Sequence, residues 1–250
     1  MAIEENRNSQ PLIEIQDLSR TYGAGEATVH ALQEINLSIN AREMLALMGP
    51  SGSGKSTLMN ILGLFDRPSS GSYYLDGQDM TRLKRRQQAS YRGRHIAFVF
   101  QGIHLLPRLS ALDNVELPMS YARMPASQRR KQALEALELL GIVHLKDRYP
   151  SQMSGGQAQR VAIARAIAPS PLLLLADEPT GALDRKSGSV VLQAFQELHE
   201  NTGVTIVIVT HDPLVSQHAE RIVSLEDGQI IGDYPVEDRI IEANVGGRQS

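Results

Sequence analysis

Two kinds of hydrophobic pattern along the chain predict two kinds of β-strand. Near the N-terminus, Ile35, Leu37 and Ile39 alternate with polar residues, as in a strand with one buried and one exposed face. Later segments are almost uninterrupted apolar runs, typical of strands covered on both faces: 44–48, 96–100, 172–176 and 205–209. We therefore expect an antiparallel sheet early in the chain and a mainly parallel sheet after it.

Local signals add a hairpin and a helix. Asp227-Gly228 lies between two apolar stretches, and this dipeptide provides the positive φ angles that a tight hairpin requires. Between residues 123 and 141 apolar residues recur at helical spacing opposite charged ones, and Gly141 is typical of a helix end. The sequence thus predicts a hairpin near the C-terminus and an amphipathic helix in its middle.

The mainly helical stretch from about residue 91 to residue 153 is interpreted as a lobe inserted into an α/β core. The core then consists of residues 1–90 and 154–231, within a single domain that spans residues 1–250. The tail, residues 232–250, is polar, with one short helix expected around 238–243 and no assigned role.

Composition narrows the possible functions. The chain has no cysteine, which excludes disulfides, thiolate metal sites and thiol nucleophiles. Its net charge of -3, from 25 basic and 28 acidic residues spread along the chain, favours neither nucleic acid nor an anionic membrane as a partner. The apolar runs are far shorter than the roughly 20 residues that a membrane-spanning helix needs. We expect a cytoplasmic protein that reaches a membrane only through another chain.

A glycine-rich loop between an apolar strand and a helical pattern is the strongest chemical signal. It has the complete form G-x-x-x-x-G-K-[ST], in which backbone N–H groups and a helix N-terminus face phosphates. Lys55 adds a charge near the β and γ phosphates, and the Ser56 hydroxyl would bind Mg²⁺. The loop predicts ATP or GTP binding and consists of Gly49, Pro50, Ser51, Gly52, Ser53, Gly54, Lys55, Ser56 and Thr57.

Two carboxylates end the apolar strand 172–176. Asp177 is expected to hold Mg²⁺ or its waters, and the adjacent Glu178 to align or deprotonate the attacking water. An Asp-Glu pair alone is as often the solvated start of a loop. Together with the phosphate loop, the pair predicts nucleotide hydrolysis.

A serine-glycine run precedes that strand and opens a helix. Ser154-Gly155-Gly156-Gln157 resembles the signature of ABC ATPases, and its amides would form a second anion site at a helix N-terminus. An ordinary serine-capped helix would be the alternative for a shorter match. The resemblance implies that this run closes over the ATP of a partner subunit, so that two chains enclose two nucleotides head to tail.

The remaining elements of the ABC pattern occur in order along nearly the whole chain. The resemblance implies that Tyr22 stacks on adenine, and that Gln101 links Mg²⁺ and the water to the helical lobe. It also implies that Asp184 communicates across the dimer and that His211 contacts the γ-phosphate. Taken singly, Tyr22 could be a packing residue, Gln101 a loop amide and His211 a helix cap.

The fold that this resemblance implies is α/β: a RecA-like P-loop NTPase core with an N-terminal antiparallel β-subdomain and an inserted α-helical subdomain. Two departures from the family pattern are small. Met153 stands where the signature usually has leucine, and Ala41-Arg42-Glu43 replaces a turn that usually contains glycine. Neither removes a catalytic group, and methionine should preserve the packing of leucine.

Segments 98–109, 114–118 and 176–184 resemble the macrolide-exporter and lipoprotein-releasing (MacB/LolD-like) branch of ABC ATPases. The resemblance implies Mg²⁺-dependent ATP hydrolysis by a homodimer or paired subunit at the cytoplasmic face of the inner membrane. It also implies membrane permease subunits with an extracytoplasmic domain and allows a periplasmic adaptor. No membrane region follows in the sequence, so a stand-alone ATPase subunit is expected.

Other functional classes remain open at this point. One is an FtsE-type regulatory ATPase of a cell-envelope complex that moves no solute. Another is an ABC ATPase acting on DNA or ribosomes, which is disfavoured because tandem cassettes and coiled coils are missing. The basic cluster in 82–94 is interpreted as a solvated helix face, so no nucleic acid is expected as a partner.

A run of apolar residues follows Gln101, where the family receives a short helix of the membrane protein. We hypothesise that part of this set forms an exposed groove, whereas the alternative is that it builds the core of the helical lobe. Its members are Ile103, Leu105, Leu106, Leu109, Leu112 and Val115.

Overall fold

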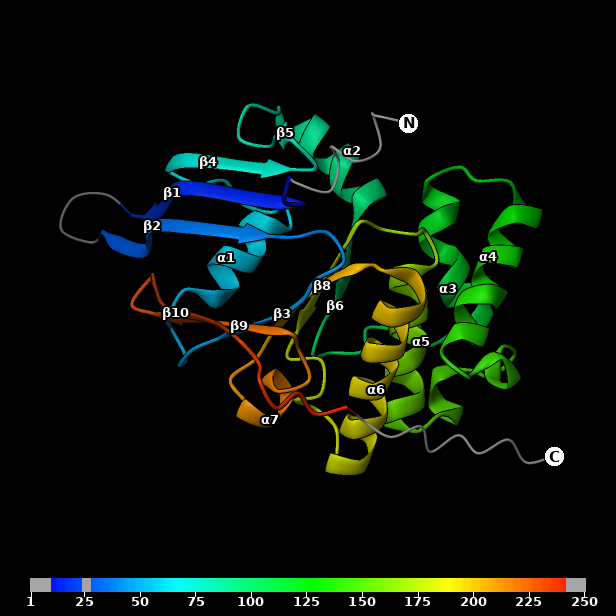
Figure 1. Ribbon diagram of the computed structural model, residues 1–250. Coiled ribbons are helices and arrows are strands. Elements are labelled where there is room, and N and C mark those ends of the chain that lie inside the picture. Colours follow the sequence, from blue (N-terminus) through cyan, green and yellow to red (C-terminus); the bar gives the residue numbers. More distant parts are fainter. Residues whose placement is uncertain (1–9, 24–27, 242–250) are drawn as a thin grey trace, which may run out of the picture.

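Two sheets lie one above the other in the computed structural model, which describes residues 10–23 and 28–241 (Figure 1). The upper sheet has four antiparallel strands in the order β2-β1-β4-β5. These strands are β1 (Ile13–Tyr22), β2 (Val29–Ile39), β4 (Ser70–Leu75) and β5 (Gln78–Asp79). The alternation predicted for residues 35–39 is confirmed, because Ile35, Leu37 and Ile39 of β2 are all buried.

The lower sheet has six strands in the order β10-β9-β3-β8-β7-β6, of which all but β10 run parallel. The four predicted apolar strands lie side by side in it. The strands are β3 (Met44–Met48), β6 (Ile96–Val99), β7 (Leu173–Asp177), β8 (Thr205–Val209), β9 (Arg221–Glu226) and β10 (Gln229–Pro235).

Alternate residues of each central strand serve opposite faces of the lower sheet, which explains why the strands are apolar throughout. In β3, Leu45 and Leu47 join a cluster with the upper sheet and α1 (Lys55–Leu62), so α1 is enclosed between the two sheets. Met44 and Ala46 join a second cluster on the other face, which contains the helices of the lobe. The lower sheet is therefore shared by both hydrophobic clusters.

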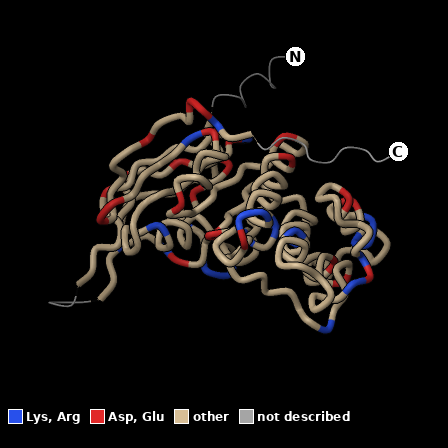
Figure 2. The backbone as a smooth tube through the Cα atoms, turned by 90° about the horizontal axis from the view of Figure 1, so that it is seen from below, with Lys and Arg blue, Asp and Glu red and all other residues tan. Residues whose placement is uncertain are grey.

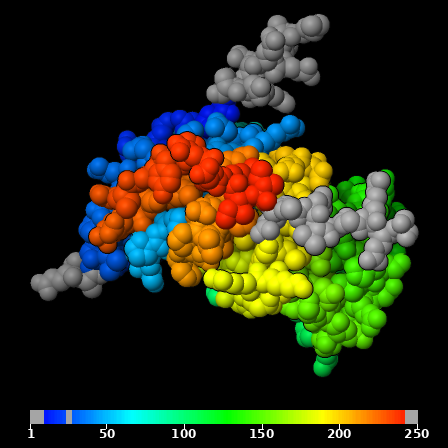
Figure 3. All heavy atoms as spheres, turned by 60° about the horizontal axis from the view of Figure 1, so that its bottom comes forward, coloured from blue at the N-terminus to red at the C-terminus, as the bar shows by residue number. Residues whose placement is uncertain are grey.

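The remaining helices gather mainly on that second face, with the helical lobe at one end of the molecule (Figures 1 and 3). The second cluster draws on α3, α4, α5 and α6. The helices are α2 (Arg85–His95), α3 (Ala111–Tyr121), α4 (Ala126–Leu139), α5 (Gly155–Ile167), α6 (Arg185–Thr202) and α7 (Pro213–Ser216), with 3-10 turns at Val143–Leu145 and Pro150–Gln152. The predicted helix end is observed, since Gly141 has φ +65° just after α4.

The boundaries of the predicted lobe differ from the observed elements. β6 lies within residues 91–153 yet belongs to the core sheet, and α2 crosses the boundary at residue 91. The helices of the inserted segment thus begin after Val99. The division of the chain into core, lobe and tail stays a prediction, and the first helices of the lobe would then follow β6.

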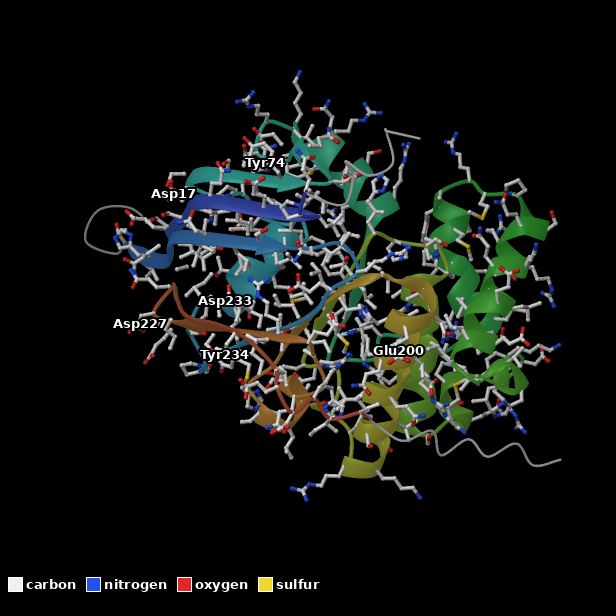
Figure 4. The ribbon with its side chains drawn as sticks, viewed as in Figure 1. Asp17, Tyr74, Glu200, Asp227, Asp233 and Tyr234 are labelled. Atoms are coloured by element: carbon white, nitrogen blue, oxygen red, sulfur yellow. The ribbon has the colours of Figure 1, made fainter. Side chains whose placement is uncertain are left out.

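The predicted hairpin around Asp227-Gly228 is observed as β9 and β10, and Figure 4 places Asp227 at its outer end. β10 continues to Pro235, so the segment assigned to the tail starts with a strand. Arg221 of β9 holds β10 through two 2.6 Å bonds to Asp233 and reaches Glu43 at 3.0 Å. Of the helix expected around 238–243, residues 238–241 are not helical and 242–243 lie outside the described residues.

The basic cluster on and before α2 is exposed except for Arg92. That guanidinium lies 4.5 Å from the Phe65 ring centroid and donates to Leu64 O, and burial lowers its pKa. Elsewhere basic and acidic residues are interspersed along the backbone of the core and the lobe (Figure 2). The description of this cluster as a largely solvated helix face is consistent with these positions.

Both departures from the family pattern can be located. Met153 is partly buried and packs against the second hydrophobic cluster, as expected for a replacement of leucine. Arg42 has φ +61°, a left-handed conformation that glycine would adopt without strain. Its N–H donates to Thr205 Oγ1 at 2.9 Å, which anchors the turn before β3.

Replacing Gly203 by alanine should lower the free energy of unfolding by about 1–2 kcal/mol. Gly203 ends α6 with φ +66°, and a Cβ there would lie 2.9 Å from Arg42 Nε. Urea unfolding followed by circular dichroism measures the effect. The matched control is Gly93→Ala in exposed α2, where a Cβ meets nothing within 4 Å; it should stabilise the protein by roughly 0.5 kcal/mol. Equal effects of the two changes would contradict this account.

Candidate nucleotide-binding and catalytic site

Four adjacent parallel strands end at the same edge of the lower sheet, and each is followed by predicted site residues. β3 leads into the phosphate loop 49–57, β8 into His211, β7 into Glu178 and β6 into Gln101. The carboxyl edge of a parallel sheet is where open α/β folds bind ligands. The structure thus brings together segments that are far apart in the sequence.

The phosphate loop has the backbone form that its glycines predict. Gly52 has φ +85°, and a Cβ on it would point into space free of other atoms within 4 Å. Gly54 has φ +103° at the N-cap of α1, and a Cβ there would lie 2.6 Å from Ala31 O. Only glycine fits at Gly54, whereas the open side of Gly52 leaves room for an approaching ligand.

The loop also presents polar groups suited to an anion. Lys55 Nζ lies in the loop, 2.7 Å from both Gly49 O and Pro50 O. Ser53 Oγ is buried and has no hydrogen-bond partner among the described residues. Beside the loop is a hollow of about 360 Å³, lined by Lys55, Ser56 and Thr57 together with residues of β2 and the β9–β10 turn. The N-terminus of α1 opens at this place, as an anion site requires.

Glu178 and His211, predicted separately, are in direct contact. His211 Nδ1 lies 2.5 Å from Glu178 Oε1, and the His211 backbone N–H donates to the same oxygen at 3.1 Å. Thr210 Oγ1 donates to the other carboxylate oxygen at 3.3 Å. With Glu178 as a carboxylate, these donors fix its orientation and leave the imidazole, which is 72% exposed, at the mouth of the site.

The backbone at Glu178 is strained. Its φ is +44°, a left-handed conformation that is uncommon for glutamate and concentrated at functional sites. The Glu178 N–H donates to Val209 O at 2.9 Å, and Glu178 O accepts from Gly181 N at 3.0 Å. The strand end therefore turns sharply at this residue and directs its carboxylate toward His211, which follows the neighbouring strand β8.

Asp177 is half-buried beside Glu178. Burial raises the pKa of Asp177, the charge of Glu178 raises it further, and Lys55 partly opposes the shift. Two neighbouring carboxylates with one nearby ammonium leave negative charge that a divalent cation would offset. The site chemistry thus fits Mg²⁺, for which a hydroxyl at Ser56, a carboxylate at Asp177 and an amide oxygen at Gln101 are suitable ligands.

Replacing Asp177 by asparagine should raise the melting temperature of the nucleotide-free protein at pH 7–8, on the order of 2 °C. A carboxyl whose pKa is raised by folding favours the folded state while protonated, and loses that contribution as the pH rises through its folded-state pKa. At neutral pH the ionised Asp177 therefore opposes folding. Differential scanning fluorimetry from pH 4 to 8 tests the sign: the gain should grow with pH.

The matched control for this prediction is Asp184→Asn. Hydrogen bonds from the Ser187 hydroxyl and backbone hold the pKa of Asp184 below its usual range, so its ionised form favours folding. The control variant should gain nothing at neutral pH. Stabilisation of both variants, or of neither, would contradict the opposite directions of the pKa shifts of Asp177 and Asp184.

Tyr22 lies at the end of β1, opposite Val29 of β2, which lines the hollow beside the phosphate loop. Its hydroxyl donates to Asp66 Oδ2 at 2.6 Å, and the Arg20 guanidinium lies 4.3 Å from its ring centroid. Tyr22 as a whole is 37% exposed. The hydrogen bond holds the end of the side chain and Arg20 covers one face of the ring, so the other face can receive an aromatic base; adenine stacking stays a prediction.

Gln101 and Asp184 flank the turn that follows Glu178. A Cβ on Gly181 would lie 2.9 Å from Gln101 Nε2, so the amide lies against this turn. Asp184 is exposed and caps α6, accepting from Ser187 N at 3.0 Å and Ser187 Oγ at 2.7 Å. The structure therefore gives Asp184 a capping function, and its function across a dimer stays a prediction.

The signature run forms the N-terminus of α5. Ser154 Oγ accepts from Gln157 N at 3.3 Å and Gln157 Oε1 accepts from Ser154 N at 3.0 Å, which is a capping box. Ser154 and Gly155 are exposed. The hydrogen bonds described for this tip lie within its own helix, so its first amides remain free for an outside anion.

Two residues of the site were missed by sequence reasoning. Thr210 bonds Glu178, and Gln159 of α5 bonds the backbone beside Gln101 and Glu178. Gln159 offered a signal, because a glutamine on the apolar face of a helix is unusual. Thr210 offered none beyond its position before His211.

The ABC transporter family model matches residues 32–181 of the chain. The chain belongs to the ABC transporter family. The resemblance to ABC ATPases and the predicted fold class are thus confirmed, and the chain is an ATP-binding cassette of this family.

Relatives place the cassette near the MacB proteins. It is 51% identical to the macrolide export ATP-binding/permease protein MacB of Sodalis glossinidius (strain morsitans), over 89% of this chain and 34% of that protein. It is 52% identical to the ABC transporter ATP-binding protein YvrO of Bacillus subtilis (strain 168), over 89% of this chain and 96% of that protein. The cassette spans about a third of the length of the MacB relatives it matches.

Solved structures agree with the fold. The dimeric, post-hydrolysis ATP-binding cassette MJ0796 bound to ADP and Pi is 42% identical, with a TM-score of 0.79 over 90% of this chain and 98% of that one. CbiO1 of Clostridium perfringens, part of the ABC transporter complex cbiONQ, is 30% identical, with a TM-score of 0.84 over 92% and 90% of the two chains. The prediction of an ABC-type ATPase is confirmed by these similarities. Within residues 10–23 and 28–241, no helix has the length and apolar character needed to span a membrane.

Proposed function

We propose that the cassette hydrolyses Mg²⁺-ATP to power export or lipoprotein extraction through membrane permease subunits. The observation that carries the proposal is the contact between His211 and Glu178 at the strand ends beside the phosphate loop. It supports hydrolysis because phosphoryl transfer depends on positioning and charge stabilisation, and these residues supply both. The names of the MacB relatives support the transport part.

In this mechanism Lys55 and the amides at the N-terminus of α1 bind the phosphates, and Tyr22 stacks on the base. Glu178 orients a water and accepts its proton as the water oxygen attacks the γ-phosphorus and the bond to ADP breaks. A doubly protonated His211, held by Glu178 through Nδ1, would donate from Nε2 to the γ-phosphate. Mg²⁺, when bound by Ser56, Asp177 and Gln101, would neutralise phosphate charge.

The active unit is proposed to be a head-to-tail pair of cassettes. Ser154 and Gly155 at the tip of α5 are exposed, and the side-chain hydrogen bonds described for residues 154–157 lie within that helix. Such a tip suits the phosphates of a second subunit. The dimeric form of MJ0796 supports this arrangement.

The test is the dependence of ATP hydrolysis on protein concentration. Phosphate release per cassette should rise with concentration, disappear when EDTA removes Mg²⁺, and stay unchanged when DNA or RNA is added. Light scattering at each concentration reports the dimer fraction. Activity that is proportional to a purely monomeric population would reject the proposal, and stimulation by nucleic acid would favour the class of soluble ABC ATPases.

The membrane partner is proposed to dock beside Gln101, at the cytoplasmic face of the membrane. Of the apolar run after Gln101, Leu112 and Val115 are buried in the core and Leu105 packs partly against it, whereas Leu106 is 45% exposed. The hypothesis of a groove therefore narrows to the segment around Leu106. An extracytoplasmic domain and a periplasmic adaptor belong to the same proposal.

Replacing Leu106 by glutamate should abolish co-purification of the membrane partner while ATP binding and the unfolding midpoint stay within error, because a charge at a docking contact is desolvated on assembly. The matched control is Val190→Glu on α6, which is 36% exposed and distant in sequence. Unchanged capture by the Leu106 variant would exclude this docking position. Capture of a membrane protein that has no path for a solute would favour the alternative of a regulatory ATPase that moves no solute.

A further inference from the structure

A buried amide connects the signature helix to the ends of two core strands. Gln159 lies in the second turn of α5, whose N-cap is Ser154, and it is 1% exposed. Its Nε2 donates to Phe100 O at 3.3 Å and to Pro179 O at 3.0 Å. One side chain therefore uses both of its N–H groups on two separate backbone segments.

The two accepting segments carry the catalytic groups. Phe100 immediately precedes Gln101, and Pro179 immediately follows Glu178. They leave β6 and β7, which are neighbouring parallel strands. Because Gln159 bonds the main chain at both places, a shift of α5 must be accommodated by the backbone next to Gln101 and Glu178.

The orientation of the amide is fixed by its surroundings. Turned the other way, its oxygen would face two carbonyl oxygens, which would repel it. In the observed orientation Oε1 is buried without a hydrogen-bond partner among the described residues. A buried acceptor of this kind is unfavourable, so the glutamine is best explained by the two bonds that it donates.

The tip of α5 also contacts the segment after Glu178. A Cβ on Gly155 would lie 3.0 Å from Leu183 Cδ2, and one on Gly156 would lie 3.2 Å from Ser187 Cβ. Gly181 of the same segment lies against the amide of Gln101. The helix that is expected to bind the partner's nucleotide is thus packed against the turn that carries its own catalytic glutamate.

We propose that Gln159 is a positioning residue that couples the α5 tip to the catalytic groups of its own chain. When the tip binds the nucleotide of the other subunit, α5 moves, and Gln159 transmits that movement to the backbone at Gln101 and Glu178. Occupation of one site thereby sets the geometry of the other. This inference rests on the head-to-tail dimer proposed above.

The chain offers a matched control. Gln196 of α6 is also buried, at 4% exposure, and its Nε2 donates to His218 O at 3.1 Å and Ile240 O at 2.7 Å. These carbonyls belong to the segments around α7 and after β10, away from the catalytic strand ends. Replacement of either glutamine by methionine, which is similar in length and unbranched, removes two donated bonds of the same kind.

Steady-state ATP hydrolysis separates the two positions. Gln159→Met should lower kcat roughly tenfold or more and change KM less than about threefold, because binding groups are kept and catalytic geometry is lost. Gln196→Met should lower the urea midpoint with kcat nearly unchanged. Gln159→Glu should be at least as impaired, since a carboxylate would face both carbonyl oxygens. Equal kcat losses in both methionine variants would overturn the proposal.

Mixed dimers locate the effect within one chain. Each hydrolysing chain is mixed with a large excess of a chain that carries Glu178→Gln, so that nearly all of it pairs with that chain. Wild type mixed with Glu178→Gln is the reference. Gln159→Met opposite Glu178→Gln should be nearly inactive, because the only chain with Glu178 lacks Gln159. Both changes in one chain opposite wild type should keep the reference activity. If the first pair is active and the second pair is inactive, Gln159 acts only through the α5 tip on the partner's site, and the proposal is overturned.

Failure of the underlying dimer would be visible separately. If Glu178→Gln forms no ATP-bound dimer, the proposed function itself is wrong. If that dimer forms with and without Gln159→Met, while Gln159→Met hydrolyses ATP as wild type does, only the inference about Gln159 is wrong. Should the methionine variant not fold, Gln159→Leu and Gln196→Leu provide the same comparison.

Discussion

Glu178→Gln should lower the rate of ATP hydrolysis by about 10²–10⁴-fold, the usual contribution of a general base. Glutamine keeps the size of the side chain but cannot take a proton from water. Its amide oxygen can still accept from the His211 backbone N–H, and its NH2 group, in place of the other carboxylate oxygen, can donate to Thr210 Oγ1. Nucleotide binding should therefore be retained, and the dimer with two bound ATP molecules should accumulate.

Phosphate release and size-exclusion chromatography with light scattering measure the two halves of this prediction. With Mg²⁺-ATP the variant should elute as a dimer, and with ADP as a monomer. Glu135→Gln, an exposed change on α4 where the side chain is 60% accessible, is the control for loss of one negative charge. Hydrolysis at the wild-type rate in the Glu178 variant would remove Glu178 as the base.

Lys55→Ala should weaken ATP binding itself by roughly 10- to 100-fold, because hydrogen bonds to charged groups contribute about 1.5–3 kcal/mol each. The ammonium is held in the loop by Gly49 O and Pro50 O, so it is already placed where the phosphates would lie. Removing it also removes the cation that opposes the raised pKa of Asp177. Titration with a fluorescent ATP analogue gives the dissociation constant.

The control for Lys55 is Lys131→Ala, an exposed lysine that pairs with Glu135 on the surface of α4. It should bind ATP as wild type does. Affinity of the Lys55 variant within twofold of wild type would mean that the loop amides and the α1 N-terminus suffice for binding. Lys55→Arg is informative in addition, because it keeps the charge but not the compact ammonium.

The strands of the core and the groups at their ends could be predicted from the sequence because both follow local rules. Apolar runs such as 205–209 must be covered on both faces, and the intact loop 49–57 leaves little freedom for its backbone. His211 and Glu178 were predicted individually, since each follows a recognisable strand. Their contact depends on β7 and β8 being neighbours, and strand order is set by packing of the whole sheet.

Other features could not be predicted because they depend on partners distant in the sequence. Nothing local indicates that Gln159 bonds Phe100 and Pro179, which lie far from it along the chain. The sequence does not distinguish α2, which leads directly into the core strand β6, from the helices of the predicted lobe. Arg42 has a left-handed φ, which an arginine in the sequence does not indicate.

The sharing of one sheet by two hydrophobic clusters determines how the molecule comes apart. β3, β7 and β8 lose their buried contacts only if the antiparallel sheet and the helical lobe are both displaced. Regions that depend on most of the fold exchange their amide hydrogens only through global opening. The central strands that carry the reactive groups are thus the last part of the molecule to unfold. The outer elements can fluctuate without disturbing the alignment of proton acceptor and phosphate.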